Sequence, residues 1–433
     1  MNSYKRINGF YVKKDEEPLI KYLVPEHCID EDLGEKGIDA SYAKRFLQNE
    51  LNGILNSFVN GGFSNKGYLF YPLIKDVSKE NKSRLMRLKK VAMFLKDNGH
   101  DFSHSLGKFR NEINSRNFSV VLSALYEDLY KLDIKNTKTK KKAICKEFNI
   151  ADHKKDGNYL APLMELKEYA NSRLRPYLSG FYLHGSFATK DYIKGWSDVD
   201  TLSIISRETI KNPKKLLELR SRLYCARKFF YSIDPLQHHG SMVISEYEME
   251  NYCQYYFPVT VFDYSLSLLK NDKAMDFKVA DCKKEAIGKL FWFVSYFRQL
   301  NCEKRYRFNS HDTKNLLHFV TLFPALYLQA KGTPTYKKFS FDKAKKDFKE
   351  EDWKVVDYVS SLRSDWRSFV TLPLIKPLAN INPLLCYQVN AKIIDIFGGV
   401  GKKNSIDAKR LVENMFSLSE QAWRKIRKNA DKI

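Results

Sequence analysis

The chain has 433 residues, of which 43% are hydrophobic, and it carries 74 Lys and Arg against 51 Asp and Glu. That apolar share excludes wholesale disorder, and the net charge of +23 favours polyanions such as nucleic acid, nucleotides or anionic lipid headgroups. An AT-rich genome, which also enriches Lys, Asn and Tyr, is an alternative explanation of the charge. Seven dispersed Cys, a polar N-terminus and no run of about 20 apolar residues predict a cytoplasmic protein without a membrane span.

The length predicts two or three domains. Residues 1–157 are expected to form a mainly helical N-terminal region, because apolar residues recur at helical spacing over Ser41–Asn56 and Lys82–Asp97. The basic run Lys138–Lys142 is expected to be a solvated linker or a basic tract.

Residues 158–265 differ in character, because short apolar segments typical of strands alternate with helical patterns. A helix over Asn158–Leu178 precedes a strand at 181–183. Two more strands, at 199–205 and 241–244, flank a predicted helix over Pro213–Tyr231.

Residues 266–433 are again predicted to be helical, most clearly at Lys283–Gln299 and Asp312–Gln329. The expected fold class is therefore α+β, with a small mixed-sheet core flanked by N-terminal and C-terminal helical regions.

The residues suited to chemistry gather in FYLHGSFATKDYIKGWSDVDTLSII, residues 181–205. The first strand ends in a turn at Gly185 and Ser186, where backbone amides and a hydroxyl can approach a phosphate. Asp198 and Asp200 are separated by one residue at the start of the second strand, so alternation places both carboxylates on one face. Paired carboxylates bind hard cations such as Mg²⁺, and this combination suits nucleotidyl transfer with two metal ions.

This arrangement resembles the signature of the DNA polymerase beta-like nucleotidyltransferase superfamily, in its bacterial template-independent type. The resemblance covers residues 160–265 and rests on Gly185, Ser186, Asp198 and Asp200. It implies a nucleotidyltransferase core that binds an NTP or dNTP with two Mg²⁺ ions, for which Mn²⁺ can substitute. Asp198 and Asp200 would be the metal ligands and catalytic residues. A chance Asp-x-Asp beside an ordinary Gly-Ser turn is the alternative.

A third carboxylate is not evident from the sequence. Gln237, His238 and His239 occupy the place where the family usually has an acid, while Asp234 precedes a proline and Glu246 follows the strand. Three interpretations are open: a histidine replaces the acid, Asp234 or Glu246 takes its place, or the site is degenerate. We favour His239 as a catalytic residue and expect a neutral imidazole that acts as ligand or proton acceptor.

A weaker resemblance lies in residues 318–341, which look like the helical partner domain of small bacterial nucleotidyltransferases. In that domain a Lys in a loop after a helix reaches the triphosphate. Lys337 and Lys338 occupy the corresponding loop and are expected to bind the triphosphate together with Gly185 and Ser186. Surface lysines of a Lys-rich protein are the alternative.

The sequence thus predicts a template-independent nucleotidyltransferase that moves a nucleoside monophosphate from an NTP or dNTP to a hydroxyl. The predicted acceptor is a nucleic-acid 3′ end or a growing oligonucleotide, as in bacterial antiviral defence. The alternatives are a toxin-type nucleotidyltransferase acting on tRNA or a protein, and a catalytically degenerate protein that binds a nucleotide or RNA. A partner protein or a homo-oligomer is left open.

Overall fold

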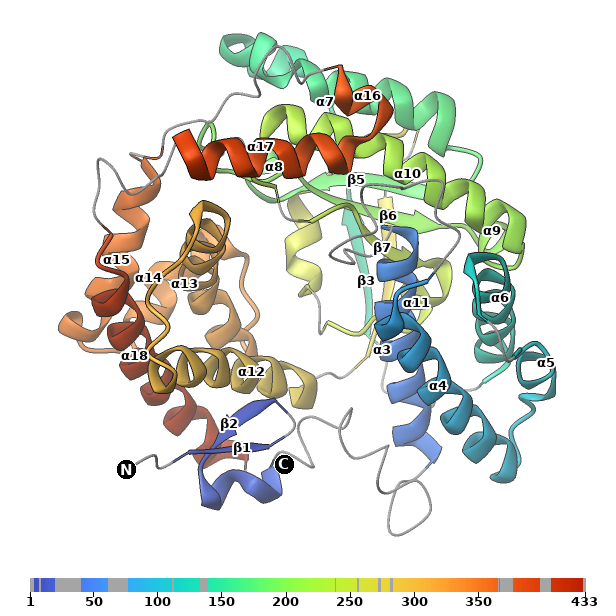
Figure 1. Ribbon diagram of the computed structural model, residues 1–433, viewed down its shortest axis with the longest axis horizontal. Helices are drawn as coiled ribbons and strands as arrows, with labels where there is room; N and C mark the ends of the chain where they lie inside the picture. Colours follow the sequence, from blue (N-terminus) through green and yellow to red (C-terminus); the bar gives the residue numbers. More distant parts are fainter. Residues whose placement is uncertain are drawn as a thin grey trace.

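The fold is α+β, as the sequence predicts: helices surround small sheets (Figure 1). The structure is a computed structural model that describes residues 4–7, 9–19, 40–60, 77–110, 113–132, 139–237, 239–254, 257–271, 274–280, 283–364, 366, 377–397 and 406–430. Among these residues no helix combines the length and the apolar character needed to cross a membrane.

A five-stranded mixed sheet forms the centre of the fold, with the strand order β4-β8-β5-β6-β7. Strand β5 is antiparallel to both β6 and β8, whereas β6 and β7 are parallel. The end of β5 therefore meets the beginnings of β6 and β7 at one edge of the sheet. The strands are β4 (Lys146–Glu147), β5 (Leu178–His184), β6 (Asp200–Ile205), β7 (Met242–Ser245) and β8 (Leu266–Ser267).

The connection from β6 to β7 runs through helix α10 (Pro213–Ile233), which lies along one face of the sheet (Figure 1). Asn212 caps this helix by accepting hydrogen bonds from the amides of the first turn, and Pro213 suits the first helical position. The short helices α8 (Gly185–Thr189), α9 (Arg207–Ile210) and α11 (Glu246–Glu250) follow β5, β6 and β7.

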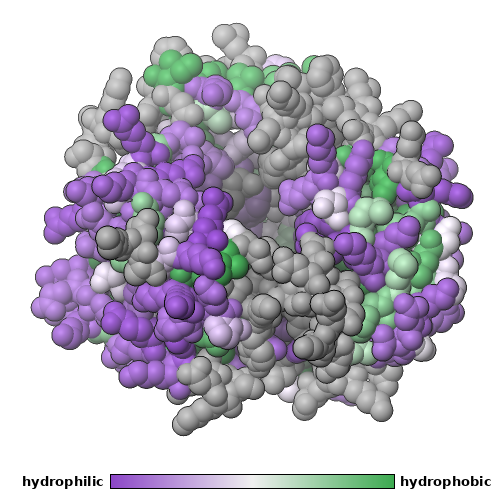
Figure 2. Space-filling view, turned by 60° about the horizontal axis from the view of Figure 1, so that its bottom comes forward, coloured by the Kyte–Doolittle hydropathy of each residue, from purple (hydrophilic) through white to green (hydrophobic). Residues whose placement is uncertain are grey.

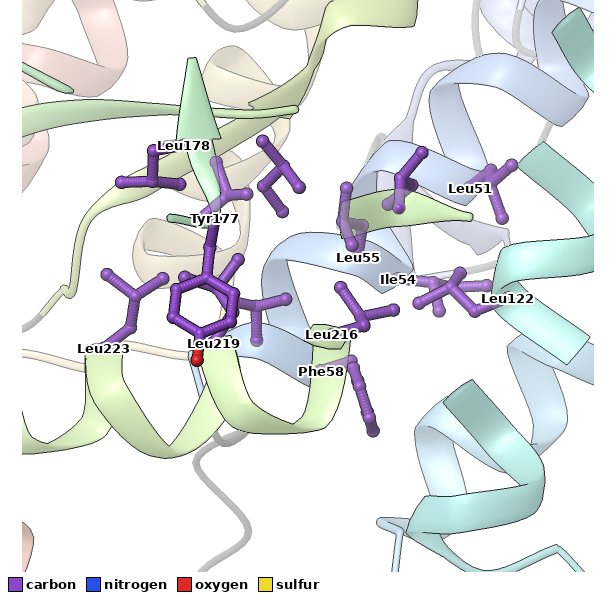
Figure 3. Close-up of a cluster of buried hydrophobic side chains, with 14 of the residues drawn as sticks. Leu51, Ile54, Leu55, Phe58, Leu122, Tyr177, Leu178, Leu216, Leu219 and Leu223 are labelled. Atoms are coloured by element: carbon purple, nitrogen blue, oxygen red, sulfur yellow. The ribbon is translucent and has the colours of Figure 1, made fainter. Parts of the chain in front are cut away.

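The N-terminal helices share one hydrophobic core with the sheet. In Figure 3, leucines and other apolar side chains of α3 and α10 converge with Leu178 of β5, and all of them belong to one buried cluster. The core forms because these helices repeat apolar residues every three or four positions. The helices are α3 (Ala40–Val59), α4 (Lys79–Asp97), α5 (Ser103–Leu106), α6 (Ser115–Lys131) and α7 (Gly157–Tyr169).

A second hydrophobic core holds the C-terminal helices together, and it also contains Phe10 and Val12 from the N-terminal hairpin. The expected boundaries at residues 157 and 265 stay a prediction, but the cores cut across them. The elements here are β1 (Lys5–Ile7), β2 (Phe10–Val12), α12 (Lys283–Cys302), α13 (Ser310–Ala330), α14 (Lys337–Lys345), α15 (Glu350–Ser364), α16 (Leu378–Ile381), α17 (Pro383–Phe397) and α18 (Ala408–Ala430).

A buried ionic cluster, which we call the Arg298 clasp, joins the hairpin segment to these helices. The Arg298 guanidinium donates to both carboxylate oxygens of Glu16, at 2.6 and 2.9 Å, and to Glu420 Oε1 at 2.5 Å. Trp423 Nε1 donates to Glu16 Oε1 at 2.8 Å. The clasp therefore connects α12 and α18 to a segment close to the N-terminus.

Residues 139–142 of the basic run do not form a linker, so that alternative was wrong for them, while Lys138 lies outside the described residues. Residues Thr139–Ile144 form strand β3, which pairs antiparallel with β9 (Ala274–Val279). Only Ala143 of this strand is buried. The sequence therefore shows no alternation of apolar and polar residues that would have indicated a strand. Lysines are common on such exposed edge strands, because they discourage pairing with other chains.

Figure 2 shows that one face of the molecule is hollowed near its centre, with hydrophilic residues gathered around the hollow. The view is turned about the horizontal axis, so helices α12–α15 and α18 remain on the left and helices α3–α6 on the right (Figures 1 and 2). The two helical parts therefore flank a polar depression.

Candidate active site

The two predicted carboxylates lie at the edge of the sheet where three strand ends meet. Asp200 begins β6 opposite His184, the last residue of β5. Val199 is fully buried, Asp198 nearly so, and Asp200 is partly exposed. The parallel pairing of Leu202 with Met242, extended backwards, brings the residues before β7 to the same edge.

Gly185 lies directly against Asp200, so the two sequence motifs are in contact. Its φ of +71° is in the left-handed region, which favours glycine. A methyl group built on its Cα would overlap the Asp200 carboxylate. Gly185 and Ser186 open helix α8 rather than forming an isolated turn, and Ser186 is half-buried there.

Replacing Gly185 by Ala is expected to reduce any activity of the site by at least about tenfold, because the methyl group displaces the Asp200 carboxylate. The left-handed backbone adds a stability cost of about 1–2 kcal/mol. Turnover and urea unfolding of the Ala variant check both effects. Gly332→Ala is the matched control: its φ is +90° but no atom lies within 4 Å of the added methyl group, so it should lose stability alone.

Gln237 holds the Asp-bearing segment in place. Its side chain is fully buried, accepts a hydrogen bond from the Val199 amide at 2.9 Å and donates one to the Val199 carbonyl at 2.9 Å. The amide side chain thus satisfies the main chain of the residue between the two carboxylates. Gln237 occupies the predicted position of the third acid, but its contacts are those of a positioning residue.

His239 is brought to the two carboxylates. Its Nε2 lies 3.4 Å from Asp200 Oδ1 and 3.7 Å from Asp198 Oδ2. Burial opposes a charged imidazole, but the interaction with Asp198 and the charge of Asp200 outweigh it and raise the His239 pKa to about 9. The expectation of a neutral imidazole concerns the site with a bound cation and stays a prediction; without a cation, the carboxylates favour the imidazolium.

The other candidates for a third acid separate clearly. Asp234 is buried beside the pair, whereas Glu246 follows β7 at the opposite end of the sheet and accepts a hydrogen bond from the Arg207 amide at 2.7 Å. His238 lies outside the described residues. Asp234 is thus the carboxylate that the fold brings to Asp198.

Sequence reasoning missed Lys314, which comes from the first turns of α13. It is 1% exposed, and its ammonium donates to Asp198 Oδ1 at 2.7 Å and to Asp234 Oδ2 at 2.5 Å. Burial opposes ionisation of Asp198, but Lys314, with His318 and His239, holds the Asp198 pKa well below its ordinary value. Burial, reinforced by the Asp198 charge, raises the pKa of Asp234 to about 8 despite Lys314.

Two further groups from the C-terminal helices border the carboxylates. His318, one helical turn after Lys314, has its Nε2 3.9 Å from Asp198 Oδ2 and stacks on the buried Trp196 with ring centroids 4.5 Å apart. Arg363 of α15 lies over the same Trp196 ring, 5.8 Å from its centroid. Burial lowers the Arg363 pKa, and its Nε has no hydrogen-bond partner among the described residues.

Lys337 faces this group, whereas Lys338 is exposed. Both lysines lie in the first turn of α14, so the predicted loop is a helix start. Burial, followed by the positive charge of Arg363, lowers the Lys337 pKa to about 8 against the opposing attraction of Asp200 and Asp198. The positive charges of Lys337 and Arg363 thus act on each other, and a bound polyanion would reduce that repulsion.

The donors at this edge are of the types that bind a divalent cation. Asp198 Oδ2, Asp200 and His239 offer two carboxylates and an imidazole, which are ligands of Mg²⁺ or Mn²⁺ sites. Asp198 Oδ1 and Asp234, the remaining acidic donors, hold Lys314. No preformed cluster of three or more His, Cys, Asp or Glu side chains with metal-binding geometry occurs in the part of the chain that the structure describes.

Comparisons with models of protein families, with curated proteins and with solved structures find no match to this chain. Its function therefore has to be argued from the chemistry of the site.

Proposed function

We propose that this chain is a template-independent nucleotidyltransferase that moves a nucleoside monophosphate from an NTP or dNTP to an acceptor hydroxyl. The acceptor that its net charge of +23 favours is a nucleic-acid 3′ end or a growing oligonucleotide. The observation that carries the proposal is the contact of Gly185 with Asp200 beside Asp198 and His239, with Lys337 of a separate part of the fold near enough to feel the charge of both carboxylates.

The chain supplies one set of groups for the phosphates of a nucleotide and another for a divalent cation. Lys337 and Arg363 provide positive charge for the phosphates, and Gly185 leaves room for a phosphate to approach the backbone. Asp198, Asp200 and His239 would hold the divalent cation. When bound, such a cation supplies Lewis-acid stabilisation of the charge on the attacking and leaving oxygens.

Asp200 is the more accessible of the two carboxylates, so we assign it the orientation of the acceptor hydroxyl. Asp198 is tied to Lys314 by one oxygen and keeps the other for the cation. Trp196 and His318 wall the site behind Asp198 and limit access of water.

The test is to incubate the pure protein with each α-labelled NTP and dNTP, with Mg²⁺ or Mn²⁺, with and without RNA and single-stranded DNA. The expected result is a labelled nucleic acid or oligonucleotide together with pyrophosphate. Label that stays in the triphosphate under every condition would refute the proposal.

The pH dependence of the reaction is expected to report Lys337. Only the protonated amine attracts a triphosphate, and its pKa is lowered to about 8. Therefore kcat/KM for the nucleotide should fall as pH rises through about 8, by up to about tenfold per pH unit. An ordinary Lys, with a pKa of 10.5, would give no fall in this range.

Lys337→Arg is the matched variant, because Arg keeps its charge and should hold kcat/KM level up to about pH 10. Lys338→Arg is the control and should retain the fall near pH 8, because Lys338 is exposed. A wild-type profile that stays flat from pH 7 to 10 would remove Lys337 from the triphosphate site.

One observation favours a second candidate, a catalytically degenerate protein that binds a nucleotide. Lys314 already forms ion pairs with Asp198 and Asp234, two of the three acids at this edge. A protein of this kind would bind NTP but yield no pyrophosphate. Its affinity for NTP should fall in the Lys337→Ala variant. Nucleotide binding measured beside the transfer assay separates the two candidates.

A further inference from the structure

The centre of the proposed site contains a cation that belongs to the chain itself. Lys314 is as buried as a core residue, and its ammonium bridges Asp198 Oδ1 at 2.7 Å and Asp234 Oδ2 at 2.5 Å. Two carboxylates that share one positive charge are the arrangement in which a bound metal ion is ordinarily found.

Lys314 also leaves Asp234 with no oxygen for a metal. The second oxygen of this carboxylate, Oδ1, accepts a hydrogen bond from the Leu236 amide at 3.0 Å. The amide follows the turn that contains Pro235, so the orientation of the carboxylate is set by the local backbone. Asp234 is therefore fully engaged, by an amide on one side and an ammonium on the other.

The two oxygens of Asp198 are divided between two environments. Oδ1 binds Lys314, whereas Oδ2 lies 3.7 Å from His239 Nε2, which in turn is 3.4 Å from Asp200 Oδ1. One side of Asp198 thus faces the built-in ammonium, and the other faces the partly exposed donors where a metal can enter.

We infer that the Lys314 ammonium takes the place of a second metal ion, so that the centre binds a single divalent cation through Asp198 Oδ2, Asp200 and His239. The inference rests on the proposed function for its chemistry, although the number of bound ions is independent of turnover. A second ion would need Asp198 Oδ1 and Asp234, and expelling the buried ammonium would leave it without its two partners.

Counting bound Mn²⁺ on the full chain tests this inference. Equilibrium dialysis with Mn²⁺ alone, and again with inorganic tripolyphosphate, is expected to give one ion per chain. The electron paramagnetic resonance spectrum of that ion should show no coupling to a second Mn²⁺. Asp200→Asn should weaken the binding of this ion by at least tenfold.

Lys314→Met is expected to bind two Mn²⁺ ions, because Asp198 and Asp234 then face each other without a cation. The double change Lys314→Met with Asp234→Asn should return the count to one. Lys331→Met is the matched control: Lys331 follows the same helix and pairs with Asp347 at 2.6 Å on the surface, so its loss should leave the count at one.

Two coupled ions on the wild-type protein, or one ion on a folded Lys314→Met variant, would overturn the inference. If Lys314→Met does not fold, the wild-type count and spectrum decide the question alone. One bound ion without nucleotidyl transfer would support the inference and refute the proposed function. Two bound ions with transfer would refute the inference and support the proposed function.

Discussion

Asp200→Asn is expected to lower the rate of nucleotidyl transfer by at least about 10³-fold, equivalent to about 4 kcal/mol of transition-state stabilisation. Asn keeps the size of the side chain that packs against Gly185 but removes its negative charge. The thermal unfolding midpoint should stay unchanged, because Asp200 is partly exposed. Single-turnover assays with labelled nucleotide and thermal unfolding curves check the two parts.

Asp191→Asn is the matched control for this prediction. Asp191 lies in the same connection between β5 and β6, is exposed and accepts a hydrogen bond from Thr189. Its replacement should change the rate by less than about threefold. Asp198→Asn is less informative, because Asp198 also binds the buried Lys314 and its loss would lower stability as well as the rate. Normal turnover by Asp200→Asn would exclude Asp200 as a catalytic residue.

Arg298→Met is expected to lower the free energy of unfolding by about 3–5 kcal/mol, because Glu16 would remain buried without its two-pronged partner and Glu420 would keep only its pair with Lys13. The loss should depend on pH. Burial opposes ionisation of Glu16, but Arg298 lowers its pKa from the ordinary 4.5. A lowered carboxyl pKa contributes stability above that value and loses it as pH falls through the folded-state pKa.

Urea unfolding of wild type and Arg298→Met at several pH values measures both effects. The difference in unfolding free energy between wild type and Arg298→Met should be largest above about pH 5 and should become smaller in acid. Lys345→Met is the control: Lys345 and Asp357 form an exposed pair at 2.9 Å, whose loss should cost less than about 1 kcal/mol. An equal loss in both variants would mean that the Arg298 clasp contributes no more than a surface ion pair.

Local sequence patterns were sufficient for most helices and for the strands that carry the site. Helix α10 begins at Pro213 as predicted, and β6 begins at Asp200, one residue after the predicted start. These elements follow from apolar periodicity and from caps, which depend on nearby residues. Gly185 contacts Asp200 because the two adjacent strands β5 and β6 end and begin at the same place. This contact could therefore be predicted from the sequence motif alone.

The groups that arrive from a distant helix could not be predicted in this way. Lys314 meets Asp198 over 116 positions of sequence, a contact set by how α13 packs against the sheet edge. One signal was available: Lys314, His318 and Thr321 repeat on one face of the helix, and residues 316–328 are otherwise apolar. The role of Asp234 was also ambiguous, because an Asp before Pro is typical of an exposed turn. Its burial depends on the contact with Lys314, which the local sequence does not indicate.

The Arg298 clasp has a consequence for the order in which the protein can be completed during translation. Glu16 is synthesised before Trp423, and its contact with that residue waits for a further 407 positions of chain. The sheet and the N-terminal helices can bury their shared core before Trp423 is synthesised. The N-terminal hairpin, in contrast, completes its packing only after α18 has been synthesised. Because α12 belongs to the same core as α13 and α14, Lys314 and Lys337 gain their final support only at that moment. A nascent chain would therefore contain its acidic edge long before the lysines beside it are held in place.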